Sequence, residues 1–415
     1  MTGWSPESGG PLRGLRVAVC GSGAAVRHAG RLLASLGAVA ETGEDGWREA
    51  DGVIDASGAV PSTVDIPVVR TVDTTALEDW ASSGAMMLTG RRDGPPLRCP
   101  GQPASLGWGA LLATELLARV GGRAVMLPGP RVLAERAALA GLHRNAPCSA
   151  DGRFVVPAAP AQGEPDWPIV LNGLVRRALS VERPGLVPRR HWHFPATVVV
   201  DLTSCWAGAL CGHLLTLVGA RVIKVEDPAR PDPARNGPPE FFDLLHAGQE
   251  SVSPGERGLD RLLRKADIVL EDGEGGVWAA PDVALPDWAE DNAGRRGAGG
   301  ACWVRIDGGS GDEAAAAVGL VAFDAEAGVP APCGDAIAEP LAGVHAALAA
   351  VACRLGGGRW VAELPLRAQA AAALMGSLEP GVAPSPAPPV ARRPAGRAPE
   401  PGADTVRVVR ELGLG

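Results

Sequence analysis

Two stretches of the chain repeat one pattern, and this repeat constrains the fold more than any other feature. The clearer copy, VVVDLTSCWAGALCGHLLTLVGARVIKVED, runs from Val198 to Asp227, and a weaker copy, LRVAVCGSGAAVRHAGRLLASLGAVAET, from Leu15 to Thr42. Each copy predicts a strand, a turn of small residues, a helix with leucines at i, i+3 and i+4, and a second strand. This βαβ order is typical of a parallel sheet. We therefore expect an α/β protein with two Rossmann-like parallel-sheet lobes that arose by internal duplication.

Composition places the chain among large globular proteins. Its 415 residues allow about two to three domains, and an apolar share of 46% can fill more than one core. No apolar run reaches the roughly 18 to 20 residues of a membrane span, and the N-terminal MTGWSPESGGPLRG has no apolar signal segment. We therefore expect a cytoplasmic protein.

Charge and cysteine content argue against other classes of site. The net charge is −8 without a basic stripe, whereas nucleic-acid binding needs clustered Lys and Arg. The eight cysteines form no CxxC pair and no Cys/His cluster at zinc spacing. We expect buried free thiols, no metal, and no nucleic-acid or membrane partner.

The strand signals and the proline-rich stretches divide the chain into four parts. We expect a first lobe at residues 1–156, a Pro- and Arg-rich connector at 157–195 and a second lobe at 196–376. A Pro-rich segment with a C-terminal helix follows at 377–415. Strands are predicted at 16–19, 52–54, 68–72, 197–201, 221–225, 267–270 and 303–306, and an apolar helix at 106–120.

Several segments match one family's motifs in the same order. Val200–Arg235 supplies a strand, a small-residue turn, a helix, a K-V-E strand and a P-x-x-D-P-x-R loop, and ADIVLEDG follows at Ala266–Gly273. WVRIDGGSG at Trp303–Gly311, CGDAIAEPLAGVHAALAAV at 333–351 and the C-terminal RAPEPGADTVRVVRELGLG continue the match. The chain thus resembles the family III CoA-transferases, the group of formyl-CoA transferase, carnitine CoA-transferase and α-methylacyl-CoA racemase.

The resemblance implies the family's fold, here with a reduced small domain. It also implies an acyl-CoA ligand and chains that interlock as dimers. We expect this chain to be a divergent tandem-copy member, which forms either a homodimer or a pseudo-dimer from its own two lobes.

The family's catalytic aspartate has no counterpart in this alignment. In the transferases it follows a strand and attacks the acyl-CoA, because a carboxylate is nucleophilic at neutral pH. Alignment of RWVAELPLRAQA places Arg367 or Ala368 there. In the first lobe, RAVMLPGPRVLAERA places Arg131, Val132 or Ala134 there. An ordinary transferase reaction would need an unexpected nucleophile such as Glu135 or Glu363.

The resemblance also indicates where a CoA ligand would lie. The family lays part of CoA against the turn that is Cys205, Trp206 and Ala207 here, and Lys224 lies in the K-V-E strand. The basic residue after K-V-E is Asp227, and the lysine of the next turn is Gln249. Loss of these cations weakens phosphate binding, because charge-assisted hydrogen bonds contribute about 1.5 to 3 kcal/mol each.

Five residues are candidates for acid–base catalysis, each with a structural alternative. They are His213, Glu226, Asp335, Glu339 and Glu363. A histidine near pKa 6.5 can act as a base at neutral pH, but it can also be a core or interface residue. Asp335 and Glu339 start an apolar helix, where acids stabilise the helix dipole. Glu226 ends a parallel strand, at the edge where such sheets bind ligands, and could also be structural.

Two further motifs favour structural interpretations. GSGAAV at Gly21–Val26, with Glu41 placed like a ribose-binding acid, resembles a dinucleotide motif but lacks its third glycine, so we expect a tight turn and no NAD. His191 and His193 flank Trp192 without nearby cysteines or acids, so we expect packed or solvent-facing side chains there.

The missing nucleophile leaves three functions open. The first is an enzyme of a biosynthetic pathway that handles an acyl, thioester or carboxylate substrate without the aspartyl nucleophile. The alternatives are a non-catalytic scaffold or binding protein, and an ordinary acyl-CoA transferase. An enzyme should bring perturbed carboxylates or histidines together in a cleft, whereas a scaffold should show a filled cleft and an apolar partner surface.

Overall fold

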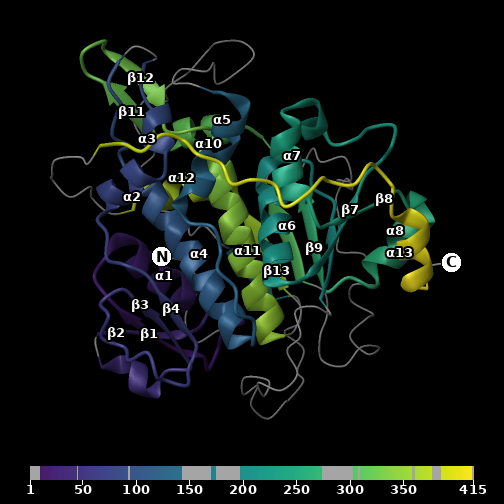
Figure 1. The fold of residues 1–415 in the computed structure, drawn as a ribbon, viewed down its shortest axis with the longest axis horizontal. Coiled ribbons are helices and arrows are strands. Elements are labelled where there is room, and N and C mark those ends of the chain that lie inside the picture. The colour runs from purple at the N-terminus through teal and green to yellow at the C-terminus, as the bar shows by residue number, and fades with distance from the viewer. Residues whose placement is uncertain are drawn as a thin grey trace.

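Two mainly parallel sheets, one from each half of the chain, enclose a layer of helices (Figure 1). The structure is a computed structural model, and it describes residues 10–43, 45–91, 94–142, 170–173, 197–272, 302–306, 309–357, 360–375 and 385–413. We call the four-stranded sheet with its helices the first lobe, and the seven-stranded sheet with its helices the second lobe. The α/β class with parallel sheets, predicted from the βαβ pattern, is confirmed.

The first lobe is built on four parallel strands in the order β2-β1-β3-β4. Its strands are β1 (Arg16–Cys20), β2 (Val39–Thr42), β3 (Gly52–Asp55) and β4 (Val68–Arg70). Its helices are α1 (Ala24–Ser35), α2 (Ala76–Ser82), α3 (Ala85–Leu88), α4 (Pro103–Val120) and α5 (Glu135–Ala140), with short 3-10 turns at Gly46–Glu49 and Pro130–Ala134. The side chains of Thr75 and Glu78 form a capping box that starts α2.

The second lobe has the strand order of a Rossmann sheet. The order is β5-β13-β10-β9-β6-β7-β8, with β5 antiparallel to β13 and the other pairs parallel. The strands are β5 (Val170–Gly173), β6 (Val198–Asp201), β7 (Arg221–Val225), β8 (Glu250–Val252), β9 (Ile268–Asp272), β10 (Cys302–Ile306) and β13 (Trp360–Leu364). The chain leaves β6 toward β7 on one side and returns to β9 on the other, so a topological switch point lies beside β6.

Helices and a small hairpin complete the second lobe. They are α6 (Trp206–Val218), α7 (Pro239–His246), α8 (Gly255–Leu263), α10 (Gly311–Ala317), α11 (Ala338–Gly356) and α12 (Leu366–Ala373), a 3-10 turn at Pro233–Asn236, and the antiparallel pair β11 (Val321–Asp324) and β12 (Val329–Pro332). The helix α13 (Thr405–Glu411) ends the described chain.

Four helices join the lobes in one continuous apolar core. The helix α4 packs against α1 and against α11, and α11 packs against α6. Two glycines allow close approach: a Cβ on Gly109 would lie 2.6 Å from the carbonyl oxygen of Ala25, and one on Gly343 would lie 2.8 Å from that of Ala207. By length and composition α11 could cross a membrane, but 89% of its apolar window is buried inside the molecule. Its apolarity is explained by its place between the lobes.

Residues 385–400 form an extended strap that crosses both lobes, drawn in yellow in Figure 1. The Ala387 amide donates to the carbonyl of Ala81 in the first lobe, and the Ala398 amide donates to the carboxylate of Asp243 in the second, both at 2.8 Å. Beyond the strap, α13 packs beside β8 and buries Val408. The absence of helix and strand in the described Pro-rich residues agrees with the prediction, because proline lacks the amide donor that both require.

The predicted strands and the helix at 106–120 are all present, with ends displaced by at most a few residues. The expected connector at 157–195 contains a strand that the sequence analysis did not find, β5, which adds to the edge of the second sheet. The hairpin β11–β12 was also missed. The domain boundaries and the duplication stay predictions.

Candidate active site

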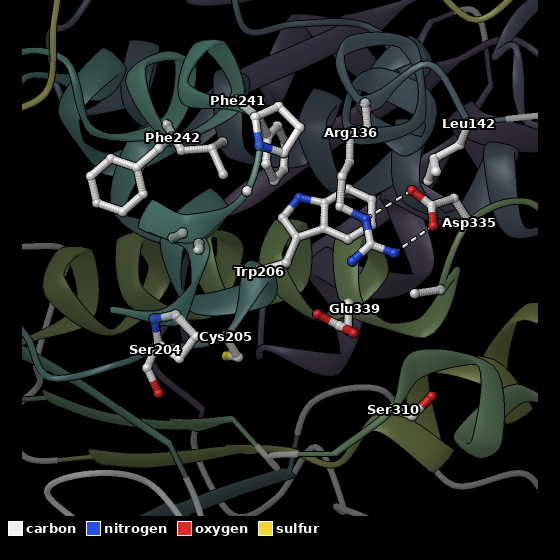
Figure 2. Close-up of a pocket in the computed structure, with 18 of the residues that line it drawn as sticks. Arg136, Leu142, Ser204, Cys205, Trp206, Phe241, Phe242, Ser310, Asp335 and Glu339 are labelled. Carbon is white, nitrogen blue, oxygen red and sulfur yellow. Dashed lines mark hydrogen bonds and ion pairs between the residues drawn. The ribbon is translucent and has the colours of Figure 1, made fainter. Parts of the chain in front are cut away.

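A cavity of about 740 Å³ lies at the carboxyl ends of β6 and β10. Its walls come from the turn after β6, from α7, from the start of α11 and from α5 of the first lobe (Figure 2). Ligands of open α/β sheets bind at this edge, next to the switch point. The volume lies within the range of about 300 to 1,000 Å³ that small-molecule sites occupy.

One side of the cavity is apolar and aromatic. Trp206, at the start of α6, meets Phe241 of α7 edge to face, with ring centroids 5.7 Å apart. Phe242 and Leu245 of α7 also line the cavity, and Leu142, just after α5, lines it beside Asp335 (Figure 2). Such a wall can hold an acyl chain and keep water away from it.

An ion pair between the two lobes forms the polar side. The Arg136 Nε donates to the Asp335 carboxylate at 2.8 Å, and Nη2 donates to its second oxygen. The Arg136 guanidinium also lies over the ring of Trp206, 4.5 Å from its centroid, as a cation–π contact. Figure 2 shows Arg136 between Trp206 and Asp335. Among the described residues, no acceptor is found for Nη1.

Glu339 is the most perturbed acid of the cavity. Burial raises the pKa of its carboxyl group from 4.5 to about 7; Arg136 opposes this shift, and the charges of Asp335 and Asp312 add to it. The Glu339 carboxylate accepts one long hydrogen bond, 3.4 Å from the Gly311 amide. At neutral pH this group is present in both protonation states.

A tight turn before α11 places Asp335 and Glu339. Ala336 has a φ of +44°, which is left-handed and costs an L-residue about 1 to 2 kcal/mol. The Ala336 amide donates to Asp312 at 3.1 Å, which holds the turn. Gly311 lies so close to this turn that a Cβ there would be 2.4 Å from the Ala336 carbonyl oxygen. The glycine of the predicted GGSG loop is therefore required by close approach.

The structure brings four of the predicted site residues to the cavity: Cys205, Trp206, Asp335 and Glu339. Ala207 is adjacent, and its carbonyl faces Gly343. Cys205 caps α6, because its sulfur accepts from the Gly208 amide at 3.3 Å. Burial raises the pKa of the Cys205 thiol well above its usual value, so it remains a thiol at neutral pH.

His213 and Glu226 are not among the residues that line the cavity. His213 Nε2 is 2.9 Å from Nη1 of Arg392 on the strap. Burial, with a smaller effect of Arg392, lowers the pKa of His213 to about 3, so the ring is neutral. Glu226 is clamped by Arg235, with nitrogen–oxygen distances of 2.7 and 2.6 Å, and accepts from the Ser251 hydroxyl.

Three of the residues expected to contact CoA are instead bound to other protein groups. Lys224 is buried, with Nζ 2.8 Å from an Asp232 carboxylate oxygen. Asp227 pairs with Arg230. Gln249 donates to the Leu245 carbonyl at 3.0 Å, and its Oε1 lies 2.9 Å from His246 Nδ1.

Glu363, the last predicted acid, is on β13, where it is in register with Arg305 of β10. It is not among the residues that line the cavity.

The glycine turn of the first lobe is closed by a carboxylate. Asp73 accepts from the amides of Ser22 at 2.8 Å and of Gly23 at 2.9 Å. A Cβ on Gly21 would lie 2.6 Å from the Asp73 carboxylate. The carboxylate thus occupies the place that a phosphate takes at a helix N-terminus. Glu41 pairs with Arg16 at 3.0 Å, and both are partly exposed.

No group of three or more possible metal ligands occurs among the described residues. His191 and His193 lie outside the described residues.

Sequence reasoning missed Arg136, Asp312 and Phe241. Arg136 lies in ERAALA of the first lobe, where no motif marks it. Its partner Asp335 is 199 residues away, so only the packing of the lobes reveals the pair. Asp312 follows the GGSG loop directly, and this adjacency was a usable signal.

Residues 196–293 match the model of CoA-transferase family III. An acetyl-CoA:oxalate CoA-transferase from Acetobacter aceti is 32% identical over 96 residues, which cover 20% of this chain and 25% of that protein. A hypothetical protein from Mycobacterium tuberculosis has a TM-score of 0.35 and 25% identity, covering 42% of this chain and 54% of that chain. A CAIB/BAIF family protein from Brucella suis has a TM-score of 0.34 and 21% identity, and the match covers 43% of this chain and 54% of that chain. This chain spans a quarter of the curated relative and about half of the solved chains.

Proposed function

We propose that the chain belongs to the family III CoA-transferase superfamily, because residues 196–293 match its model, and that it is an enzyme that acts on an acyl thioester or a carboxylate. The reaction uses acid–base chemistry in the 740 Å³ cavity and no aspartyl nucleophile. Glu339 is the proton-transferring group.

The observation that carries this proposal is the place of Glu339: its carboxyl group is buried at the cavity wall, beside Arg136 and Asp335, and this burial raises its pKa to about 7. A general acid–base group works best when its pKa lies near the working pH, because both forms are then populated. A carboxyl group left in water titrates near 4.3 and lacks this property.

The surrounding groups suit such a reaction. Nη1 of Arg136 donates a hydrogen bond to the carbonyl oxygen of the substrate, and so stabilises negative charge that develops there. Asp335 acts as a positioning residue, because it holds the other two guanidinium nitrogens that donate. The Glu339 carboxylate takes a proton from the substrate carbon or from an attacking water, and its acid form returns a proton.

The other two hypotheses have less support. A scaffold was expected to have a filled cleft, whereas this cavity is open. For an ordinary transferase, neither proposed nucleophile lines the cavity, and Arg392 holds the carboxylate of the buried Glu135 at 2.6 and 2.9 Å.

The assembly and the cellular setting belong to the same proposal. We propose that the two lobes form a pseudo-dimer within the chain, which the α4–α11 packing supports. The cytoplasm is the proposed compartment, because the seven described cysteines are free thiols, as in reducing compartments.

The test compares Glu339→Gln with Glu313→Gln, a control at an exposed position of α10. Thiol release from a panel of acyl thioesters, and exchange of α-hydrogens in D₂O followed by mass spectrometry, report the two reaction types. We expect activity that changes near pH 7, a loss of about 10² to 10⁴-fold in E339Q and none in E313Q. Full activity in E339Q would overturn the proposal. An inactive wild-type protein whose cavity binds none of the panel would favour the scaffold.

A further inference from the structure

The half of the crevice where a nucleotide would bind is filled by the protein's own groups. In a Rossmann sheet the phosphates lie on the turn after the first strand, and the ribose contacts an acid at the end of the second strand. In the second lobe these places are the turn at Ser204 and the end of β7 at Glu226.

The turn after β6 has few free donors for a phosphate. Ser204 donates from its amide at 2.7 Å and from its hydroxyl at 2.8 Å to the Asp272 carboxylate. Thr203 donates from its amide at 2.9 Å and from its hydroxyl at 2.6 Å to Asp201. Both acceptors are negatively charged when ionised, so they would also repel a phosphate.

The end of β7 is closed in the same way. Glu226 is bonded to Arg235 and to the Ser251 hydroxyl, and Lys224 is bonded to Asp232. The space that remains between the β6 turn and the end of β7 is about 10 Å³. That volume holds at most one water molecule.

The neighbouring cavity has room but the wrong charge for phosphates. Arg136 is its only Lys or Arg among the described residues, and it faces Asp312, Asp335 and Glu339. A ligand with several phosphates would therefore be repelled there. An acyl group on a short uncharged arm fits both the volume and the aromatic wall.

We infer that the substrate is an acyl thioester of pantetheine length, without the adenosine phosphates of CoA. This inference rests on the proposed function of the cavity. Two sources present the same chemistry: a free pantetheine thioester, and the phosphopantetheinyl arm of a carrier protein whose phosphate stays at the mouth of the cavity.

The experiment is isothermal titration of the full chain with one acyl group carried by pantetheine, by CoA and by a phosphopantetheinylated carrier protein. Adenosine 3′,5′-bisphosphate serves as a competitor, and each titration is run at low and at moderate salt. We expect the pantetheine thioester to bind at least as tightly as the CoA thioester, with little salt dependence and no competition by the bisphosphate. Tenfold tighter binding on the carrier protein would assign that source, and equal binding would assign the free thioester.

Two variants locate the binding. Leu142→Trp, which places a large ring in the cavity, should lower the affinity for all three thioesters at least tenfold. Arg230→Ala removes an exposed guanidinium beside the filled crevice and should leave all three affinities unchanged. A CoA thioester that binds tenfold tighter than the pantetheine thioester, competes with the bisphosphate and weakens in R230A would overturn the inference.

The two proposals fail in different ways. Tight pantetheine binding with unchanged turnover in E339Q would leave the inference of a pantetheine-length substrate standing and overturn the role of Glu339. Absence of binding by all three thioesters would overturn that inference together with the substrate class of the proposed function.

Discussion

The two lobes use the same strand–turn–helix unit for different purposes. In the first lobe, residues of that lobe close the start of α1, because Asp73 accepts from its turn and the Thr74 carbonyl accepts from the Ala24 amide at 3.0 Å. In the second lobe, the start of α6 exposes Trp206 to a cavity, and Arg136 of the other lobe lies over its ring. A site thus arises where the unit meets a neighbouring lobe.

The lobes also correspond in how their helices pack. Gly109 of α4 approaches Ala25, the second residue of α1, and Gly343 of α11 approaches Ala207, the second residue of α6. These parallels support the proposed duplication. Four residues before each glycine stand Ser105 in α4 and Glu339 in α11.

The two helices differ in chemistry at that position. The buried Ser105 hydroxyl donates to Asp79 at 2.5 Å, whereas Glu339 faces the cavity. The second helix has an acid where the first has a neutral group that is already paired.

The largest effect should come from Glu339→Gln, which removes this difference. In the folded protein the pKa of Glu339 is raised from 4.5 to about 7, so the folded state binds the proton more tightly than the unfolded state. Stability is therefore lost as pH rises from about 4.5 to 7, by up to about 3 kcal/mol. In E339Q the free energy of unfolding should change less between pH 5 and pH 8, and E339Q should be the more stable protein at pH 8. Urea unfolding at pH 5 and pH 8 measures both free energies. An equal change with pH in E339Q and wild type would contradict the raised pKa.

Gly109→Ala and Gly343→Ala test whether the two helix contacts are equivalent. The new Cβ would lie 2.6 Å from a backbone oxygen in the first lobe and 2.8 Å in the second. Overpacking costs about 1 to 3 kcal/mol, which exceeds the gain of about 1 kcal/mol in helix propensity. Both variants should be destabilised, G109A more, as judged by urea midpoints. Gly129→Ala, where a Cβ meets nothing within 4 Å, is the control. If only one variant loses stability, the correspondence fails.

Arg392→Met tests how the strap joins the lobes. The Arg392 guanidinium binds the Glu135 carboxylate at the start of α5 and lies 2.9 Å from His213 of α6. Removal leaves a carboxylate that is 2% exposed without its cation. Because the arginine side chain is itself 32% exposed, we expect the free energy of unfolding to fall by about 2 kcal/mol. This is less than the roughly 3 to 5 kcal/mol lost when a fully buried ion pair is broken. The exposed neighbour Arg393→Met should be neutral in thermal unfolding; a similar loss there would contradict a specific contact.

The smallest effect should come from Asp73→Asn in the closed turn. Burial is the largest single influence and raises the pKa of Asp73, but the hydrogen bonds from Ser22 and Gly23 together outweigh it and hold the pKa below 3.8. Its stabilisation is therefore present above pH 3.8 and is lost as pH falls through the lower folded pKa. D73N should cost about 1 kcal/mol at pH 7 and less in acid, as measured by urea unfolding at pH 7 and pH 3. If D73N loses the same stability at pH 7 and at pH 3, the charge of the Asp73 carboxylate does not stabilise the turn.

Part of the candidate site could be predicted from the sequence. Trp206 and Cys205 follow a strand at the ligand-binding edge, and Asp335 and Glu339 lie at the start of an apolar helix, so local pattern was sufficient to find them. His213 has the same kind of local signal, but its ring faces Arg392, because α6 turns that side toward the strap. Lys224 and Gln249 likewise lie on the predicted elements with their polar atoms bound inside the protein.

The sequence by itself determined the α/β class, the strands of the two βαβ units and the family resemblance, because hydrophobic period, small-residue turns and proline act over a few neighbouring residues. The tertiary structure alone decided the chemistry of the cavity. Arg136 meets Asp335 from the other lobe, and burial between the lobes brings the pKa of Glu339 to about 7. Burial and ion pairing depend on residues far apart in the chain, and a local pattern does not record them.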